Sequence, residues 1–114
     1  METQIYHNPR CGKSRETLKL LNERGENVQV IEYLKYCPSF DDLKVIISKL
    51  GLKPAEIIRK GEKIYKEQYK GKDLTDDEWI QAMIENPILI ERPIVVKDGK
   101  AAVGRPAENV LDIL

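Results

Sequence analysis

The pattern of apolar and polar positions begins with a short predicted strand at residues 4–7, which an Asn-Pro pair ends directly. A helix is then predicted from about residue 12 or 13 to residue 24. Its inward face is expected to carry Leu18, Leu20 and Leu21. Gly25 follows at the position of a left-handed C-terminal cap. Residues 28–32 form a second predicted strand, so the chain opens with a βαβ unit whose two strands are parallel.

Helical periodicity dominates the middle of the chain. Ser39 and Asp42 are typical of a helix N-terminus, and Gly51 of a helix end. Apolar residues between them follow the i, i+3, i+4, i+7 spacing of an amphipathic helix, at Leu43, Ile46, Ile47 and Leu50. A short helix is predicted to begin at Pro54. The polar stretch 59–73 indicates an exposed loop or a loose helical turn.

A capping box marks the next helix. Thr75 and Glu78 form this box, which precedes the apolar residues Trp79, Ile80, Met83 and Ile84. Two apolar runs, 94–96 and 101–103, then flank an Asp-Gly pair, which predicts a tight antiparallel hairpin.

The last predicted helix opens at Pro106, with Val110, Leu111 and Leu114 on its inner face. The predicted order is therefore β-α-β, a helical insert, then β-β-α. This is the order of the α/β thioredoxin-like fold with a mixed four-stranded sheet. No linker or repeat interrupts it, so residues 1–114 are expected to form one domain.

Composition narrows the function classes. Of the 114 residues, 41% are apolar and 33% charged, and the formal net charge is zero. A neutral total disfavours a dedicated nucleic-acid binder. No apolar stretch approaches the roughly 20 residues that cross a bilayer, and no apolar signal region opens the chain. We therefore expect a cytoplasmic protein without membrane or nucleic-acid partners, and a monomer.

The cysteine count narrows the chemistry further. The chain has two cysteines and one histidine. Two cysteines are too few for a secreted domain stabilised by disulfides. Two cysteines and one histidine also cannot supply the four ligands of a structural zinc site. No metal and no bound cofactor are expected, so any functional cysteine acts as a thiol.

Cys11 lies between the first predicted strand and the first predicted helix. Unpaired N–H groups and the helix dipole favour an anion at such a position, which lowers the pKa of a thiol. Arg10, Lys13 and Arg15 add positive charge nearby in the sequence. Cys11 is therefore the predicted thiolate nucleophile.

His7 and Ser14 flank this cysteine. His7 ends the first predicted strand, where it can stabilise the thiolate through a relayed hydrogen bond or through charge, or can have a purely structural role. Ser14 takes the place of the second cysteine of a C-x-x-C motif. Turnover would therefore need an external thiol or a distant cysteine. Cys37 follows the second predicted strand and is either such a resolving thiol or an idle loop residue.

Three arginines are candidates for an oxyanion site. Arg59 ends the short helix, Arg92 precedes Pro93, and Arg105 precedes Pro106. In the thioredoxin-like arrangement the Arg92-Pro93 pair falls beside the N-terminus of the first helix, at the place of a cis proline. A guanidinium binds an oxyanion through planar, paired hydrogen bonds. Each arginine alone is equally typical of a solvated surface, so the residues leave a shared site open.

The chain resembles a known family over essentially its whole length. Residues 6–15, read Tyr-His-Asn-Pro-Arg-Cys-Gly-Lys-Ser-Arg, are similar to the opening of the glutaredoxin-linked arsenate reductases, the ArsC-like family. The similarity continues in order through residues 57–60, 86–96, 104–106 and 110–113. Because the chain stops after Leu114, it resembles the short branch of that family.

The resemblance implies a mechanism. The residue matching Cys11 attacks arsenate through its thiolate, and glutathione and glutaredoxin complete the reduction to arsenite. The residues matching Arg59, Arg92 and Arg105 hold the oxyanion, and the one matching His7 helps lower the pKa of the cysteine. Glutathione is then a co-substrate, and glutaredoxin a protein partner.

Two alternatives remain open. One is a monothiol redox protein that acts on glutathione mixed disulfides without arsenate. The other is a regulatory protein like the Spx-type relatives, which share the fold and bind RNA polymerase. Those relatives commonly use a C-x-x-C switch, which Ser14 removes here.

Overall fold

The structure, a computed structural model, describes residues 2–114. The chain forms two units. The first comprises Met1–Tyr36 and Arg92–Leu114, and the second comprises Cys37–Glu91. The prediction of a single domain is neither confirmed nor contradicted by this division.

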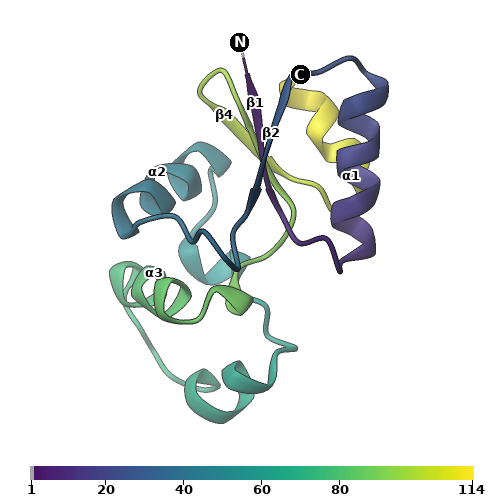
Figure 1. Cartoon of the computed structure of the whole chain (residues 1–114). Coiled ribbons are helices and arrows are strands. Elements are labelled where there is room, and N and C mark those ends of the chain that lie inside the picture. The colour runs from purple at the N-terminus through teal and green to yellow at the C-terminus, as the bar shows by residue number, and fades with distance from the viewer. Residues whose placement is uncertain (1) are drawn as a thin grey trace. The chain divides into compact units, whose positions relative to one another are not determined.

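The first unit is built on a four-stranded mixed sheet (Figure 1). Its strands are β1 (Thr3–His7), β2 (Val28–Glu32), β3 (Ile94–Lys97) and β4 (Lys100–Val103). Their spatial order is β2-β1-β3-β4, with β1 and β2 parallel and the other two pairs antiparallel. The predicted βαβ opening, the hairpin and the mixed sheet are therefore confirmed.

Helix α1 (Gly12–Glu23) and the C-terminal 3₁₀ helix η4 (Ala107–Ile113) lie together on one face of this sheet (Figure 1). The core between them is formed by four residues with no exposed surface, Ile5, Leu21, Val95 and Val110. These residues come from β1, α1, β3 and η4. The core therefore holds α1, through Leu21 near its end, against the middle of the sheet.

The inward face of α1 is more polar than the leucine pattern predicts. Ser14, Thr17 and Leu21 are buried, whereas Leu18 and Leu20 are only partly buried. The helix ends at Glu23, and Gly25 has φ +72°, which confirms the predicted left-handed residue after it.

Two further expectations concern the C-terminal third of the chain. In the β3–β4 hairpin, Asp98 and Gly99 both have positive φ, 51° and 78°, as a type I′ turn requires. The prediction that Leu111 faces inward is wrong, since this side chain is 38% exposed. The last helix is 3₁₀, with three residues per turn, so Ala107, Val110 and Ile113 share its inner face instead.

The second unit is helical. It contains α2 (Phe40–Leu50), α3 (Asp76–Glu85) and three short turns of helix, η1 (Pro54–Ile57), η2 (Tyr65–Tyr69) and η3 (Pro87–Leu89). The predicted caps are confirmed: Ser39 accepts from Asp42 N–H, and Thr75 and Glu78 form a capping box.

The stretch predicted as a loop or loose turn contains η2, a single π-helical turn. Tyr65 and Tyr69 from this turn pack against Trp79 of α3, with ring centroids 6.3 and 6.0 Å apart. These aromatic contacts anchor a segment whose sequence is mostly polar.

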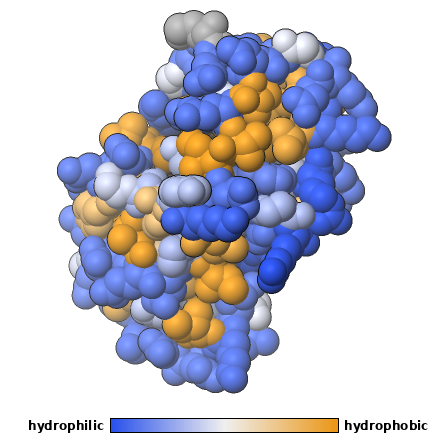
Figure 2. All heavy atoms as spheres, in the orientation of Figure 1, coloured by the Kyte–Doolittle hydropathy of each residue, from blue (hydrophilic) through white to orange (hydrophobic). Residues whose placement is uncertain are grey.

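Surface hydropathy is mixed. Hydrophilic side chains cover most of the face in Figure 2, with apolar patches between them. The more exposed large apolar residues include Val30, Leu34 and Val45. Among residues 2–114, no helix has both the length and the apolar character needed to span a bilayer.

Candidate active site

Cys11 occupies the N-cap position of α1. Its backbone is extended, with φ −93° and ψ 122°, because the chain turns here from the strand into the helix. Cys11 N–H donates to Asn8 O at 3.0 Å, and Cys11 O accepts from Arg15 N–H at 3.0 Å. The side chain is 8% exposed, so the thiol is largely shielded from water at the end of a helix.

The backbone of α1 stabilises the thiolate form of Cys11. Burial by itself raises the pKa of Cys11. Hydrogen bonds from the backbone of Ser14 and Lys13 and the side chain of Arg92 lower it. Together they outweigh the effect of burial, so the pKa of Cys11 lies below its ordinary value. No acidic residue stands in the first turn of the helix to oppose this effect.

Arg92 is the side-chain partner of Cys11. It lies directly before β3 and joins Pro93 through a cis peptide bond, at the place that the sequence predicts for a cis proline. Both its hydrogen bond and its positive charge lower the pKa of Cys11. Of the three predicted arginines, Arg92 therefore has a documented interaction with the predicted nucleophile.

His7 contacts Ser14, which lies one helical turn beyond the nucleophile. His7 Nδ1 and Ser14 Oγ are 2.6 Å apart, and both side chains are buried. Ser14 Oγ also accepts a hydrogen bond from Asn8 N–H at 3.1 Å. Ser14 therefore connects the end of β1, the turn after it and the first turn of α1.

The protonation of His7 follows from its surroundings. Burial lowers the pKa of His7, the charge of Glu32 raises it, and Arg15 lowers it, with a net shift downward. We therefore assign a neutral imidazole, whose Nδ1 accepts the hydrogen of the Ser14 hydroxyl. His7 therefore contacts the side chain of Ser14, the residue whose backbone N–H lowers the pKa of Cys11.

A close backbone contact fixes the segment that carries Arg92 and Arg105. Gly104 N–H donates to Pro93 O at 2.9 Å, which ties the start of β3 to the end of β4. A Cβ added at Gly104 would lie 2.5 Å from Thr17 Oγ1 and 2.9 Å from Pro93 Cγ. Only glycine fits between α1 and Pro93 without displacing one of them.

Arg105 follows Gly104 and also precedes a cis proline, Pro106. Its N–H donates to Val103 O at 2.9 Å, and its carbonyl accepts from Asn109 Nδ2 at 3.0 Å. These bonds hold the backbone of Arg105 between β4 and η4. The first unit therefore contains four of the five predicted site residues: His7, Cys11, Arg92 and Arg105.

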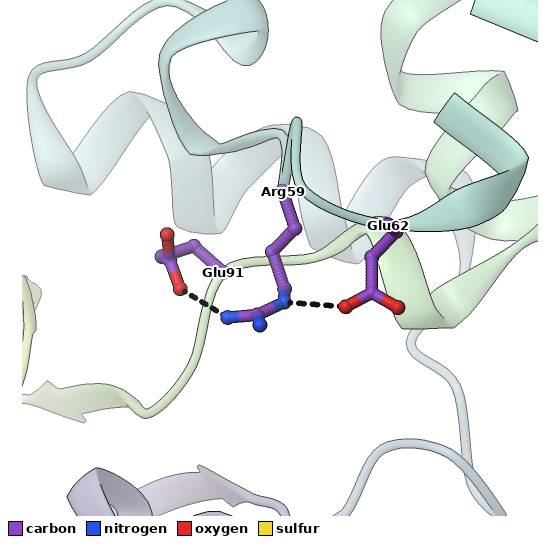
Figure 3. A network of polar contacts seen from close by, with 3 residues as sticks. All are labelled: Arg59, Glu62 and Glu91. Atoms are coloured by element: carbon purple, nitrogen blue, oxygen red, sulfur yellow. Dashed lines mark hydrogen bonds and ion pairs between the residues drawn. The ribbon is translucent and has the colours of Figure 1, made fainter. Parts of the chain in front are cut away.

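Arg59, the fifth predicted residue, belongs to the second unit, where it contacts two carboxylates, Glu62 and Glu91 (Figure 3). Cys37 also belongs to the second unit, and burial raises the pKa of its thiol. A raised pKa makes Cys37 a poorer nucleophile than Cys11 at neutral pH. Among the described residues no group of three or more His, Cys, Asp or Glu side chains is placed to hold a metal ion.

The sequence does not indicate the structural role of three residues of this site. Ser14 is identified there only as a missing cysteine, whereas its hydroxyl links His7 to the helix. Thr17 carries no functional signal, and Gly104 appears only as part of the family similarity at residues 104–106, yet both set the distance between α1 and Pro93. Thr17 lies three residues after Ser14, so a polar i, i+3 pair on the inward face of the helix is the available clue.

Comparison with known proteins agrees with this arrangement. The sequence pattern described as the ArsC family matches residues 6–113. The chain belongs to the ArsC family. That match covers both units and nearly all of the described residues, so the recognition made from the motifs is confirmed.

Individual members of the ArsC family are similar over their full length. An arsenate reductase of Neisseria meningitidis is 46% identical over 99% of this chain and 98% of its own. The uncharacterized protein YfgD of Escherichia coli is 47% identical over 99% of this chain and 97% of its own. A solved structure named arsenate reductase from Vibrio cholerae superposes with TM-score 0.96, at 51% identity, over 100% of this chain and 98% of that one. The thioredoxin-like α/β fold of the ArsC family is thereby confirmed.

Proposed function

We propose that the protein is a thiol-dependent oxidoreductase that reduces arsenate with glutathione and glutaredoxin. The observation that carries this proposal is the environment of Cys11. In a chain of the ArsC family, Cys11 occupies the N-cap position of a helix, interacts with Arg92 and has a thiol of lowered pKa. A thiolate beside a guanidinium combines a nucleophile with a binder for the anion that it attacks.

In the proposed first step, Cys11 Sγ attacks arsenic and an S–As bond forms. One As–O bond breaks, and its oxygen leaves as water after taking up a proton. Arg59, Arg92 and Arg105 hold the remaining oxygens of arsenate. The oxygen that leaves is a hydroxyl of arsenate, and one proton converts it to water, which is a far better leaving group than hydroxide.

His7 and Ser14 are positioning residues in this proposal. The neutral imidazole accepts from Ser14 Oγ at 2.6 Å, and Ser14 N–H hydrogen-bonds to the thiolate. This hydrogen bond fixes the first turn of α1, so that the N–H groups of Lys13 and Ser14 stay directed at Sγ of Cys11.

Glutathione completes the electron balance. Ser14 replaces the second cysteine of a C-x-x-C pair, so the motif cannot close a disulfide by itself. In the proposed cycle two glutathione thiols each give up one electron and become joined as a disulfide with the help of glutaredoxin. Arsenic gains these two electrons and leaves as arsenite. Cys37 takes no part, because its thiol has a raised pKa.

We also propose that the protein acts in the cytoplasm, as a monomer, with glutathione as a diffusing co-substrate and no bound cofactor. The supporting features are its balanced charge and its two free cysteines. Both features fit a reducing compartment in which glutathione is abundant.

The test is arsenate-dependent oxidation of NADPH coupled through glutathione reductase. Wild type, Cys11→Ser and Cys37→Ser are compared, with glutathione or glutaredoxin omitted in turn. The proposal expects turnover that disappears in Cys11→Ser, survives in Cys37→Ser and needs both thiol components. Turnover with thioredoxin and thioredoxin reductase alone would contradict the proposed electron donor.

A further inference from the structure

Arg59 and Glu91 are brought together by a short backbone pairing within the second unit. Ile58 and Ile90 form an isolated antiparallel bridge. Arg59 N–H donates to Leu89 O at 2.8 Å, and Glu91 N–H donates to Ile57 O at 2.9 Å. The two residues that follow the bridge partners are therefore fixed by the backbone and do not meet by chance.

The guanidinium of Arg59 is engaged on two of its three nitrogens. Nε donates to Glu62 Oε2 at 3.2 Å, and Nη1 donates to Glu91 Oε1 at 3.0 Å. Figure 3 shows the two carboxylates on either side of the guanidinium, with its third nitrogen directed away from both. Glu62 and Glu91 are called here the carboxylate clamp of Arg59.

These ion pairs are better shielded than others in the same unit. The side chains of Arg59, Glu62 and Glu91 are 20%, 22% and 27% exposed. By contrast, Lys63 and Glu67 are 89% and 56% exposed, and their charged atoms are 3.6 Å apart. Shielding from water and salt strengthens the electrostatic effect of the clamp relative to the Lys63–Glu67 pair.

The formal charge of this cluster is opposite to what an anion site needs. One guanidinium and two carboxylates together carry a net charge of minus one. A carboxylate and an oxyanion also bind a guanidinium through the same paired N–H···O geometry. The two carboxylates engage two of the five N–H groups, so an incoming oxyanion must share the guanidinium with them or displace one of them.

We propose that Glu62 and Glu91 determine the oxyanion affinity of Arg59, by competing with substrate for its guanidinium and by offsetting its charge. This inference rests on the proposed function, in which Arg59 holds arsenate. Both effects have the same sign: neutralising either carboxylate strengthens oxyanion binding. The clamp thus keeps Arg59 from holding abundant anions such as phosphate and sulfate tightly.

The experiment measures oxyanion binding through the nucleophile. Arsenate, and separately sulfate, are titrated against the rate at which iodoacetamide alkylates Cys11 in a Cys37→Ser background. The variants are Glu62→Gln and Glu91→Gln, which keep the size and an acceptor oxygen but remove the charge. Glu67→Gln is the matched control, because it removes the same charge from an exposed ion pair nearby.

We expect the half-protecting concentration of each anion to fall by about threefold or more in either clamp variant, and to stay unchanged in Glu67→Gln. The same substitutions are repeated in an Arg59→Ala background, where the gain in protection should be clearly smaller, because the competition acts through Arg59. Circular dichroism of each variant confirms the fold, and the two carboxylates serve as independent tests.

Three results would overturn the inference. Unchanged or weaker protection in both clamp variants would show that the carboxylates do not compete with the anion. An equal gain in the Arg59→Ala background would show an effect that bypasses Arg59. Absence of protection in the wild type and in every variant would show that no oxyanion binds beside Cys11. That result would contradict the proposed function, whereas the first two results contradict only the role of the clamp.

Discussion

His7 Nδ1 lies 2.6 Å from Ser14 Oγ in the interior of the first unit, which links the end of β1 to the first turn of α1. The same hydroxyl oxygen accepts from Asn8 N–H at 3.1 Å. One buried side chain therefore satisfies two groups of the turn that carries Cys11.

Ser14→Ala should lower the free energy of unfolding by about 1–3 kcal/mol, because His7 Nδ1 and Asn8 N–H both lose their partner. It should also raise the pKa of Cys11 by loosening the turn. Urea denaturation measures the first effect. Ser48→Ala is the matched control, since Ser48 lies at an exposed position of α2. Equal stability of the two variants would show that the buried contact contributes little.

The stability of the fold should fall as the pH drops below about 6.5, the ordinary pKa of histidine. Burial lowers the pKa of His7 in the folded chain, so the unfolded chain binds more protons between that lowered pKa and 6.5. Stability therefore rises with pH through this window. The free energy of unfolding is measured at pH values from 5 to 8 in the wild type and in His7→Gln.

The variant should lose most of that pH dependence. Glu26 and Glu78 also have lowered pKa values, but their ordinary value is 4.5, so they act below the window assigned to His7. A slope that persists unchanged in His7→Gln would assign the titration to another group.

Arg92→Ala should raise the pKa of Cys11, because the variant loses a hydrogen bond and a positive charge at the thiolate. Alkylation of Cys11 by iodoacetamide at neutral pH should then slow several-fold, since the thiolate is the reacting form. The pH dependence of the alkylation rate gives the pKa directly. Arg24→Ala removes an exposed arginine from the far end of α1 and should leave the rate unchanged.

Gly104→Ala should destabilise the protein by about 1–3 kcal/mol, because the new methyl group would meet Thr17 and Pro93 at 2.5–3.0 Å. Moving Pro93 also moves Arg92, so the reactivity of Cys11 should fall as well. Gly61→Ala serves as the control, because a Cβ there meets nothing within 4 Å. A stable Gly104→Ala variant with normal Cys11 reactivity would refute this role of the close contact.

Much of the fold follows from local signals in the sequence. The caps at Ser39 and Thr75 and the Asp98-Gly99 turn are short motifs whose geometry depends on neighbouring residues, and the structure confirms them. The position of Cys11 at the start of α1 follows for the same reason. The prediction for Leu111 is wrong because the apolar pattern of so short a segment does not distinguish a 3₁₀ helix from an α-helix.

The contacts of the site join residues far apart in the chain, and the sequence does not show such contacts. Thr17 and Gly104 are 87 positions apart, and only the close approach of Gly104 to Thr17 and Pro93 makes glycine necessary. In the same way, the engagement of Arg59 by Glu91 depends on the Ile58–Ile90 bridge. A sequence pattern identifies such an arginine but not the carboxylate that faces it.

The most direct test of the central claim is the amount of arsenite formed from arsenate by the Cys37→Ser protein, in which Cys11 is the remaining cysteine. Arsenite is separated from arsenate by ion chromatography after incubation with glutathione and glutaredoxin. The account predicts arsenite in proportion to the enzyme, and none above background when Cys11 is also replaced by serine. Equal arsenite from both proteins, or from neither, would contradict a Cys11 thiolate that attacks arsenate.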